Sequence, residues 1–389
     1  MKRHLDRRAL LRTGALAGGA FLAGRLGHAA PLTHPLAPPR PFADRATKHL
    51  VLVAFAGGVR TKETLGTPAN VPTLAALAQE GVVYPRTRSA NLGHFGAALS
   101  IFTGISEARG IRENARGPDP TLFEYCRKEL DLPASEVWIS TSGGVQQTNY
   151  SYGVHPEYGP RFGANTLDGD GIFNREFKAI IDQYGRPREL GEREDELLRR
   201  LRGSIGADGS GRAGSADAAA QVERYILEEL TRGTVDLRGP NAADAKALRV
   251  ARNLLTIFQP AIVGIVLQDA DVAHGSYNAY AEVVRQNDAM LGELWKAIRE
   301  NPALADTTSI VVLPEFGRDR DLNARRGLDH GDGSDDLSWV STVCWGPDFG
   351  KGRVVNKEVR AIDVCPTLCQ LVGASAPHAK GRALPDLYA

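Results

Sequence analysis

Three short segments of this sequence carry residues that could bind a metal ion: Asp271-Val272-Ala273-His274, Glu315-Phe316-Gly317-Arg318 and Asp329-His330-Gly331. The first two follow apolar stretches at 261–267 and 309–313, which have the composition of buried strands. In an open α/β sheet, the residues just past the carboxyl ends of the strands converge on one crevice, where ligands bind. Carboxylates and imidazoles in one crevice suit a divalent metal, so the sequence predicts a metal-assisted hydrolase.

The apolar stretches alternate with segments of helical periodicity. Residues 49–56 form a nearly continuous apolar run, which is typical of a buried parallel strand. Further strands are expected at 136–140, 261–267, 309–313 and 340–345, and helices at 71–81, 120–129, 172–184 and 280–298. This alternation predicts an α/β fold with a mostly parallel central sheet and helices on both faces.

The composition is that of a soluble globular protein, with 42% hydrophobic and 24% charged residues. Lys and Arg number 47 against 46 Asp and Glu, for a formal net charge of +1. This balance favours neither a nucleic acid nor an anionic membrane as a partner. The four cysteines, which are too few for a disulfide scaffold, are expected to be small buried apolar residues: Cys126, Cys344, Cys365 and Cys369.

The N-terminus has the pattern of an export signal. The pair Arg7-Arg8 precedes a weakly apolar Gly/Ala-rich run at 13–24, and small residues at 27–30 offer a cleavage site. We therefore expect a Tat signal peptide over 1–30, a proline-rich linker over 31–45 and one domain over 46–389. No later apolar run reaches the ~18 residues that span a bilayer. The mature protein is expected to be periplasmic or secreted, without an integral membrane segment.

Two stretches interrupt the alternation of strands and helices. Residues 142–169 are rich in Tyr, Gly and Asn, and could form a loop over the crevice. Residues 186–239 are highly charged and contain a flexible Gly- and Ser-rich run at 203–215. They are expected to be an inserted helical segment. Its helices could be solvated surface helices, or they could form a functional lid.

A collinear series of motifs from about residue 50 to 387 resembles the alkaline phosphatase superfamily in its sulfatase-like and phosphodiesterase-like branches. The series is LVLVAFAGGVR, NVPTLAALAQEGVVYPRTRSAN, HFGAALSIFTG, LQDADVAHGSYNAYAEVVRQNDAMLGEL, TTSIVVLPEFGR, VCWGPDFGKGRVV and AIDVCPTLCQLVGASAPHAKGRAL. EFGR with a later DHG is similar to a divergent, Tat-exported bacterial branch. The resemblance implies an alkaline-phosphatase-like fold, and a site in which two metals bind a phosphate or sulfate ester.

The resemblance places the ligands of the first metal at Asp271, His274 and His330. The Asp-to-His spacing is three residues rather than the usual four, so Asp269 is an alternative to Asp271. The second metal site lacks its usual residues, because Gly57 stands at the position of an aspartate. Glu315 replaces a further aspartate, and Phe316 replaces a histidine. A one-metal site is therefore expected, with zinc favoured and manganese or iron as alternatives.

The nucleophile position of the superfamily falls on His94, where active members have Ser, Thr or formylglycine. His94 and Glu315 are the candidate catalytic residues; Glu315 could also be a metal ligand or the ion-pair partner of Arg318. The sequence thus favours a periplasmic hydrolase of phosphate or sulfate esters, with a small molecule or a glycan as substrate. The alternative is a catalytically inactive, sulfatase-like binding protein, and a phosphomutase or transferase is a third possibility.

Overall fold

The structure is a computed structural model that describes residues 45–107, 116–133, 136–142, 147–167 and 239–388. The predicted signal peptide, the linker up to residue 44, the helix at 172–184 and the insertion up to residue 238 lie outside the described residues. Within the described residues, no helix is long and apolar enough to cross a bilayer.

The described part of the chain is built around a nine-stranded sheet with the order β4-β3-β5-β1-β6-β7-β2-β8, in which β9 also pairs with β2. The five strands from β4 to β6 are parallel, whereas β7 is antiparallel to both β6 and β2. The mostly parallel sheet predicted from the sequence is therefore confirmed. The strands are β1 (His49–Phe55), β2 (Val82–Arg88), β3 (Val137–Thr141), β4 (Asn165–Leu167), β5 (Ile262–Leu267), β6 (Thr308–Pro314), β7 (Trp339–Trp345), β8 (Arg353–Val354) and β9 (Val359–Arg360).

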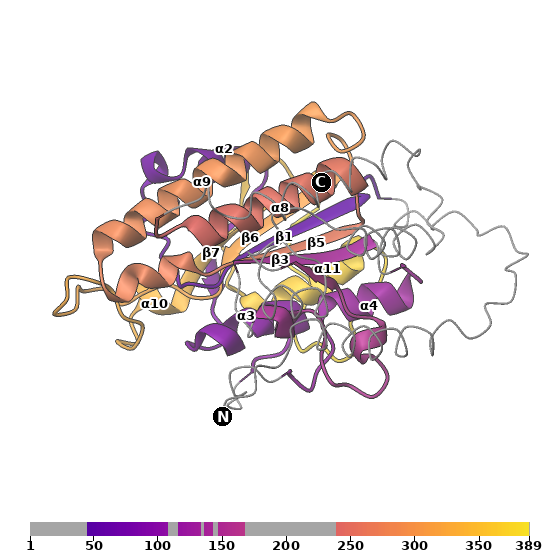
Figure 1. Cartoon of the computed structure of the whole chain (residues 1–389), viewed down its shortest axis with the longest axis horizontal. Helices are drawn as coiled ribbons and strands as arrows, with labels where there is room; N and C mark the ends of the chain where they lie inside the picture. Colours follow the sequence, from indigo (N-terminus) through magenta and orange to yellow (C-terminus); the bar gives the residue numbers. More distant parts are fainter. Residues whose placement is uncertain (1–44, 108–115, 134–135, 143–146, 168–238, 389) are drawn as a thin grey trace, which may run out of the picture. The chain divides into compact units, whose positions relative to one another are not determined.

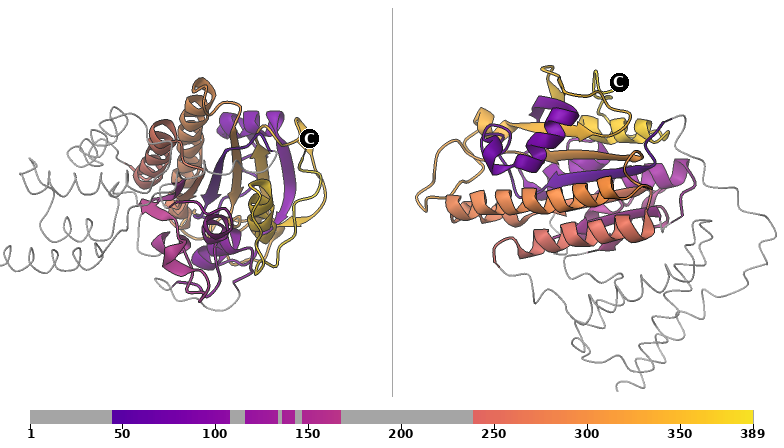
Figure 2. Two further views of the ribbon diagram at one scale, coloured as in Figure 1. Left: turned by 90° about the vertical axis from the view of Figure 1, so that its right-hand side faces the viewer. Right: turned by 90° about the horizontal axis from the view of Figure 1, so that it is seen from above.

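Helices cover both faces of the sheet, as predicted (Figures 1 and 2). One face packs on α2 (Pro72–Glu80), α8 (Ala242–Phe258) and α9 (Tyr277–Glu300). The other packs on α3 (His94–Thr103), α4 (Leu122–Glu129) and α11 (Val364–Leu371). The remaining short helices are η1 (Pro68–Asn70), η3 (Gln147–Tyr150), η4 (Gly159–Arg161), η5 (Asp269–His274), α10 (Asp335–Ser338) and η6 (Ala361–Asp363).

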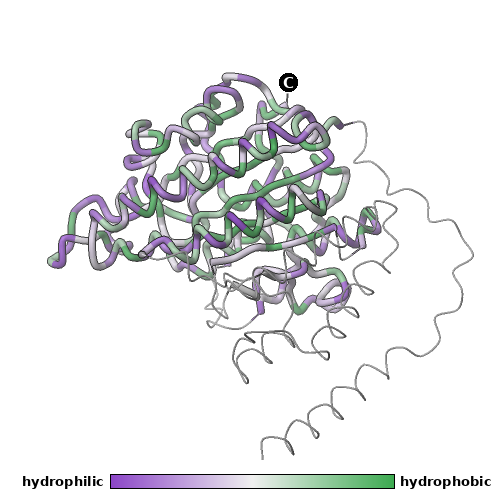
Figure 3. The backbone as a smooth tube through the Cα atoms, turned by 45° about the horizontal axis from the view of Figure 1, so that its top comes forward, coloured by the Kyte–Doolittle hydropathy of each residue, from purple (hydrophilic) through white to green (hydrophobic). Residues whose placement is uncertain are grey.

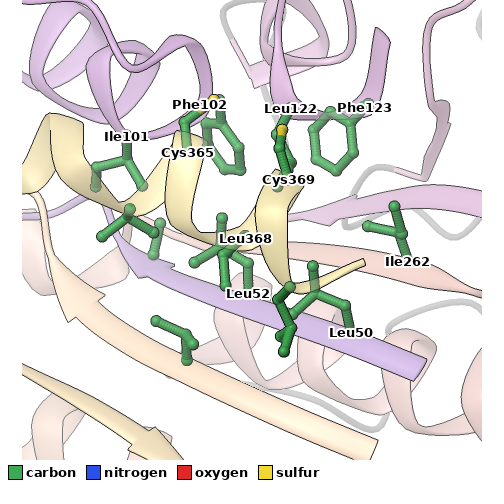
Figure 4. Close-up of a cluster of buried hydrophobic side chains, with 14 of the residues drawn as sticks. Leu50, Leu52, Ile101, Phe102, Leu122, Phe123, Ile262, Cys365, Leu368 and Cys369 are labelled. Atoms are coloured by element: carbon green, nitrogen blue, oxygen red, sulfur yellow. The ribbon is translucent and has the colours of Figure 1, made fainter. Parts of the chain in front are cut away.

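Strand β1 shows why both faces need cover. Successive side chains of a strand point to opposite faces, and every residue of β1 is buried. Leu50 and Leu52 belong to the core beneath α3, α4 and α11, whereas Val51 and Val53 belong to the core beneath α2, α8 and α9. Figure 4 shows the first of these cores, with Leu368 of α11 close to β1, and Figure 3 shows hydrophobic segments in the interior.

All four cysteines are free and buried, as expected from the sequence. Three of them line the core around α11 and α4, where burial raises the pKa of the thiols of Cys126 and Cys369 well above the usual value. A thiol with a raised pKa is a weak nucleophile. These cysteines therefore serve packing.

Candidate metal and catalytic site

Three adjacent parallel strands, β5, β1 and β6, bring the motif segments to one edge of the sheet. Gly57 and Gly58 follow β1, η5 follows β5, and Glu315 follows β6 directly. The backbone N–H of Glu315 donates to the carbonyl of Phe55 at 3.0 Å, which ties the ends of β1 and β6 together. The predicted convergence of the two strand-end segments is thus present in the structure.

The 3₁₀ geometry of η5 explains how Asp271 and His274, which are three residues apart, can share one site. A 3₁₀-helix has three residues per turn, so residues i and i+3 share one face. Asp271 Oδ1 lies 3.3 Å from His274 Nε2 as a result. Asp269, the alternative to Asp271, lies elsewhere: its Oδ2 accepts from the backbone N–H of Asp244 at 2.8 Å. The structure therefore places Asp271 with the histidines, and Asp269 against α8.

Four side chains meet at the crevice: His94, Asp271, His274 and His330. Each offers one ligand atom, and these atoms all lie within 4.8 Å of one another. Such a His/Asp cluster could bind a metal. His94 was predicted from the sequence as a catalytic residue and not as a metal ligand, and no local motif links it to the other three residues of this group.

The three imidazoles share one orientation, which their Nδ1 atoms define. His330 Nδ1 lies 3.0 Å from the carbonyl oxygen of Leu92, which can only accept, so Nδ1 carries the hydrogen. His274 Nδ1 lies 2.6 Å from Asp329 Oδ1, and His94 Nδ1 lies 2.5 Å from Glu315 Oε1. Donation of the outer N–H to a carboxylate or carbonyl is the usual support of metal-binding histidines. It leaves the three Nε2 atoms for the crevice.

The crevice side of His94 is the least satisfied part of the cluster. His94 Nε2 lies 2.9 Å from Asp271 Oδ1, which is an ion pair when the ring is protonated, and within the described residues this buried nitrogen has no other polar partner. Phe316 packs against His94 and His330, with ring centroids 4.9 and 5.2 Å apart. An imidazole nitrogen whose single polar neighbour is a carboxylate fits a site for a cation or a proton.

Glu315 stands behind His94 rather than in the group of four. Its side chain is fully buried, whereas that of His94 is 18% exposed and that of Asp271 is 39% exposed. The sequence left open an ion pair between Glu315 and Arg318. In the structure, Arg318 instead pairs with Asp271 at 2.6 Å. Among the residues that the structure describes, the side chain of Glu315 has one hydrogen bond, which it accepts from Nδ1–H of His94.

The charges of these groups shift one another. Burial alone would lower the pKa of His94, but the charge of Glu315 and the contact with Asp271 raise it to about 9. Burial raises the pKa of Glu315, against the opposing effect of His94. Burial also opposes ionisation of Asp271, yet His94 and Arg318 hold the pKa of that carboxyl far below its usual range. Burial and neighbouring positive charges lower the pKa of His330.

Gly57, which stands where the superfamily has an aspartate, has no room for a side chain. A Cβ there would lie 2.6 Å from the carbonyl oxygen of Gln268 and 2.7 Å from the amide nitrogen of Asp271. The adjacent Gly58 has φ +63°, and a Cβ at that residue would contact Arg318. The loop after β1 therefore approaches η5 and Arg318 through its backbone alone.

The strand order and the cluster at the strand ends define an α/β protein with a mostly parallel sheet and a candidate metal site at the carboxyl edge of that sheet. Comparison with solved structures confirms this fold. A mutant of the alkaline phosphatase PafA matches with a TM-score of 0.58 and 10% identity, over 91% of this chain and 100% of that one. The predicted resemblance to the alkaline phosphatase superfamily is thus confirmed at the level of the fold.

Two further solved structures share this fold. A phosphonate monoester hydrolase of Agrobacterium radiobacter matches with a TM-score of 0.51 and 16% identity, over 87% of this chain and 76% of that one. A 2-O GAG sulfatase matches with a TM-score of 0.55 and 11% identity, over 87% and 73%. No family model and no curated protein matches the sequence. At these identities the structural matches establish the fold alone.

Proposed function

We propose that this protein hydrolyses phosphate or sulfate esters with the help of one divalent cation bound by Asp271, His274 and His330. The observation that carries the proposal is the shared orientation of the imidazoles, whose Nδ1 atoms are held from outside while a carboxylate lies between the Nε2 atoms. This is the ligand chemistry of zinc, with manganese or iron as alternatives. When bound, such an ion stabilises negative charge that develops on an ester oxygen.

His94 and Glu315 are proposed as the catalytic pair. His94 is the first residue of α3, so it stands beside the helix N-terminus, which attracts anions. Glu315 accepts the Nδ1–H, which fixes the ring so that Nε2 faces the crevice. A buried carboxylate that orients an imidazole is a common arrangement for a general base or a nucleophile. His94, whose pKa is raised to about 9 in the metal-free protein, takes that role in its neutral form, which a cation on Asp271 favours. The 39% exposure of Asp271 shows that the cluster is open to solvent on one side.

The metal part of the proposal is tested by elemental analysis of protein purified without chelator. About one zinc or manganese per chain is expected in the wild type, and its loss in His330→Ala and in His274→Ala. Retention of a full equivalent in His330→Ala would reject the ligand assignment. A folded wild type that binds no divalent ion at all would reject the hydrolase.

The catalytic part is tested by His94→Ala, because a ligand and a catalytic group give opposite results. The variant is expected to keep its metal and to lose activity on 4-nitrophenyl phosphate and 4-nitrophenyl sulfate. Loss of the metal would instead make His94 a fourth ligand. A wild type that holds its metal and turns over no ester would favour the second reading, an inactive sulfatase-like binding protein. One observation favours the inactive binding protein: Gly57 has no side chain and no room for one.

Export by the Tat route is proposed from the twin-arginine pair Arg7-Arg8, which lies outside the described residues. A protein with a bound metal would then be exported already folded. Fractionation of bacterial cells tests this, since replacement of both arginines by lysine is expected to retain the protein in the cytoplasm. Unchanged periplasmic recovery of that variant would reject the Tat signal.

A further inference from the structure

The guanidinium of Arg318 lies inside the cluster, where all its hydrogen-bond donors are used. The side chain is fully buried. Nη2 donates to Asp271 Oδ1 at 2.6 Å and to the carbonyl of Gly57, and Nε donates to the carbonyl of Gly58 at 3.2 Å. Nη1 contacts His274 Nε2 at 3.2 Å and the carbonyl of Leu328 at 3.3 Å.

These five contacts equal the five N–H donors of a guanidinium. No donor remains for a substrate, so Arg318 cannot be a substrate-binding arginine in this conformation. Transfer of a charge into the protein interior is unfavourable unless acceptors surround it, and here two strand-end carbonyls, a loop carbonyl, a carboxylate and an imidazole do so. These five acceptors form a complete binding site for a cation, and the cation that occupies it is the guanidinium of Arg318.

Two of these acceptors are also candidate metal ligands. His274 Nδ1 carries a hydrogen that goes to Asp329, so Nε2 has the only lone pair of that ring, and Arg318 is in contact with it. Asp271 Oδ1 is likewise in contact with Arg318. A divalent ion that binds these atoms must displace the guanidinium from one or both, and must tolerate a fixed positive charge nearby.

We propose that Arg318 is the resident cation of this cluster, which competes with a divalent ion for Asp271 and His274 and so restricts the cluster to one such ion. The inference rests on the proposed metal site. It goes beyond that site in giving a buried arginine a role in metal selection: through its contacts with two candidate ligands, Arg318 limits how strongly the cluster binds a metal and how many ions it holds.

The test compares zinc binding, by calorimetry and elemental analysis, in the wild type, Arg318→Gln and Arg318→Lys. Glutamine removes the charge and keeps an amide donor, so the affinity is expected to rise by at least about tenfold, or a second equivalent to bind. Lysine keeps the charge, so the stoichiometry of the wild type is expected. Arg60→Gln is the matched control, because Arg60 is also a buried arginine but forms its ion pair with Glu63. Within the described residues, Arg60 has no hydrogen bond or ion pair with any of the four side chains of the cluster.

The outcomes separate this inference from the proposed function. One equivalent in the wild type and unchanged binding in a folded Arg318→Gln would overturn the inference and leave the metal site standing. No zinc in the wild type but one equivalent in Arg318→Gln would support the inference and overturn the proposed function. No zinc in either protein, or an equal gain in Arg60→Gln, would overturn the inference.

If Arg318→Gln does not fold, the wild type still provides a readout. The Nε–H of a fully hydrogen-bonded, buried guanidinium exchanges slowly, and is expected to give a resolved signal in a ¹H–¹⁵N spectrum of perdeuterated protein. Competition predicts that zinc shifts or broadens the Arg318 signal. A signal that zinc leaves unchanged overturns the inference.

Discussion

Replacement of Gly57 by alanine is expected to destabilise the protein, because backbone atoms fill the space beside this residue. A Cβ would lie 2.6 Å from the carbonyl oxygen of Gln268 and 2.7 Å from the amide nitrogen of Asp271. Both atoms belong to the backbone that enters η5, so neither can rotate away as a side chain could. Overpacking of this kind costs about 1–3 kcal/mol, and contacts this short suggest the upper half of the range.

The assay is urea denaturation of Gly57→Ala followed by circular dichroism. The midpoint is expected to fall while the slope with denaturant stays unchanged, which indicates a loss of stability rather than a change in the unfolded state. Gly275→Ala is the matched control in the same segment. Its Cβ would lie 3.8 Å from the nearest atom, the carbonyl oxygen of Val272, which is an ordinary contact. Its effect is expected to stay within about 0.5 kcal/mol.

The same change should weaken metal binding. To relieve the contact, η5 must move away from β1, and η5 carries Asp271 and His274. We expect zinc affinity to fall in Gly57→Ala and not in Gly275→Ala. If Gly57→Ala instead has the midpoint and zinc affinity of the wild type, the steric reasoning is refuted. The space beside Gly57 could then hold the aspartate of the superfamily.

Three further predictions concern carboxylates. Glu315→Gln is expected to lower kcat on an ester substrate by roughly 10²–10⁴-fold at constant metal content, because the orientation of His94 is lost. The control Glu293→Gln, at an exposed glutamate, is expected to leave kcat unchanged. Equal kcat values in Glu315→Gln and the wild type would contradict the orienting role. Asp329→Asn is expected to weaken zinc binding by roughly tenfold in a chelator competition. This is the lower end of the effect of residues that support a metal-binding histidine, because the Asp329 carboxylate is 42% exposed. Burial and a neighbouring carboxylate raise the pKa of Asp244 to about 7. Between pH 4 and 7 the folded protein therefore holds a proton that the unfolded chain has released, so the free energy of unfolding falls as pH rises, by at most about 1.4 kcal/mol per pH unit. Asp244→Asn should remove this slope in denaturation curves measured from pH 5 to 8, and an unchanged slope would refute the assignment.

The sequence predicts the part of the site that follows strands. Continuous apolar runs identify β1, β5 and β6, and the convergence of parallel strand ends then brings Asp271 and Glu315 to one edge. The order of these strands in the sheet does not follow from hydrophobicity. Short edge strands such as β4 and β8 carry too few residues for a recognisable pattern, and α8 follows a stretch that the sequence analysis treated as an insertion.

The contacts that define the site chemistry could not be predicted. His94 and Glu315 are 221 residues apart, and no local pattern links a residue at a helix start to one at a strand end. The 3₁₀ geometry of η5, which makes a spacing of three suitable for Asp271 and His274, is likewise a product of packing. Asp329 was visible beside His330 in the sequence, yet only the fold shows that its carboxylate supports His274.

The charges around the crevice argue for one divalent cation rather than two. Asp271 and Glu315 each supply one negative charge and Arg318 one positive charge, while Asp329 lies at the rim with an exposed arginine 3.5 Å away. In the metal-free protein the raised pKa of His94, about 9, keeps that imidazole protonated and the crevice close to neutral. A divalent cation bound to Asp271 disfavours this proton, and with neutral imidazoles it leaves the crevice with a single net positive charge, which suits an anionic ester. A second divalent cation would bring three net positive charges next to a fully buried guanidinium, and such uncompensated charge is strongly unfavourable away from water. The fixed arginine and the missing side chain at Gly57 therefore act in the same direction: both favour the proposed binding of a single divalent cation.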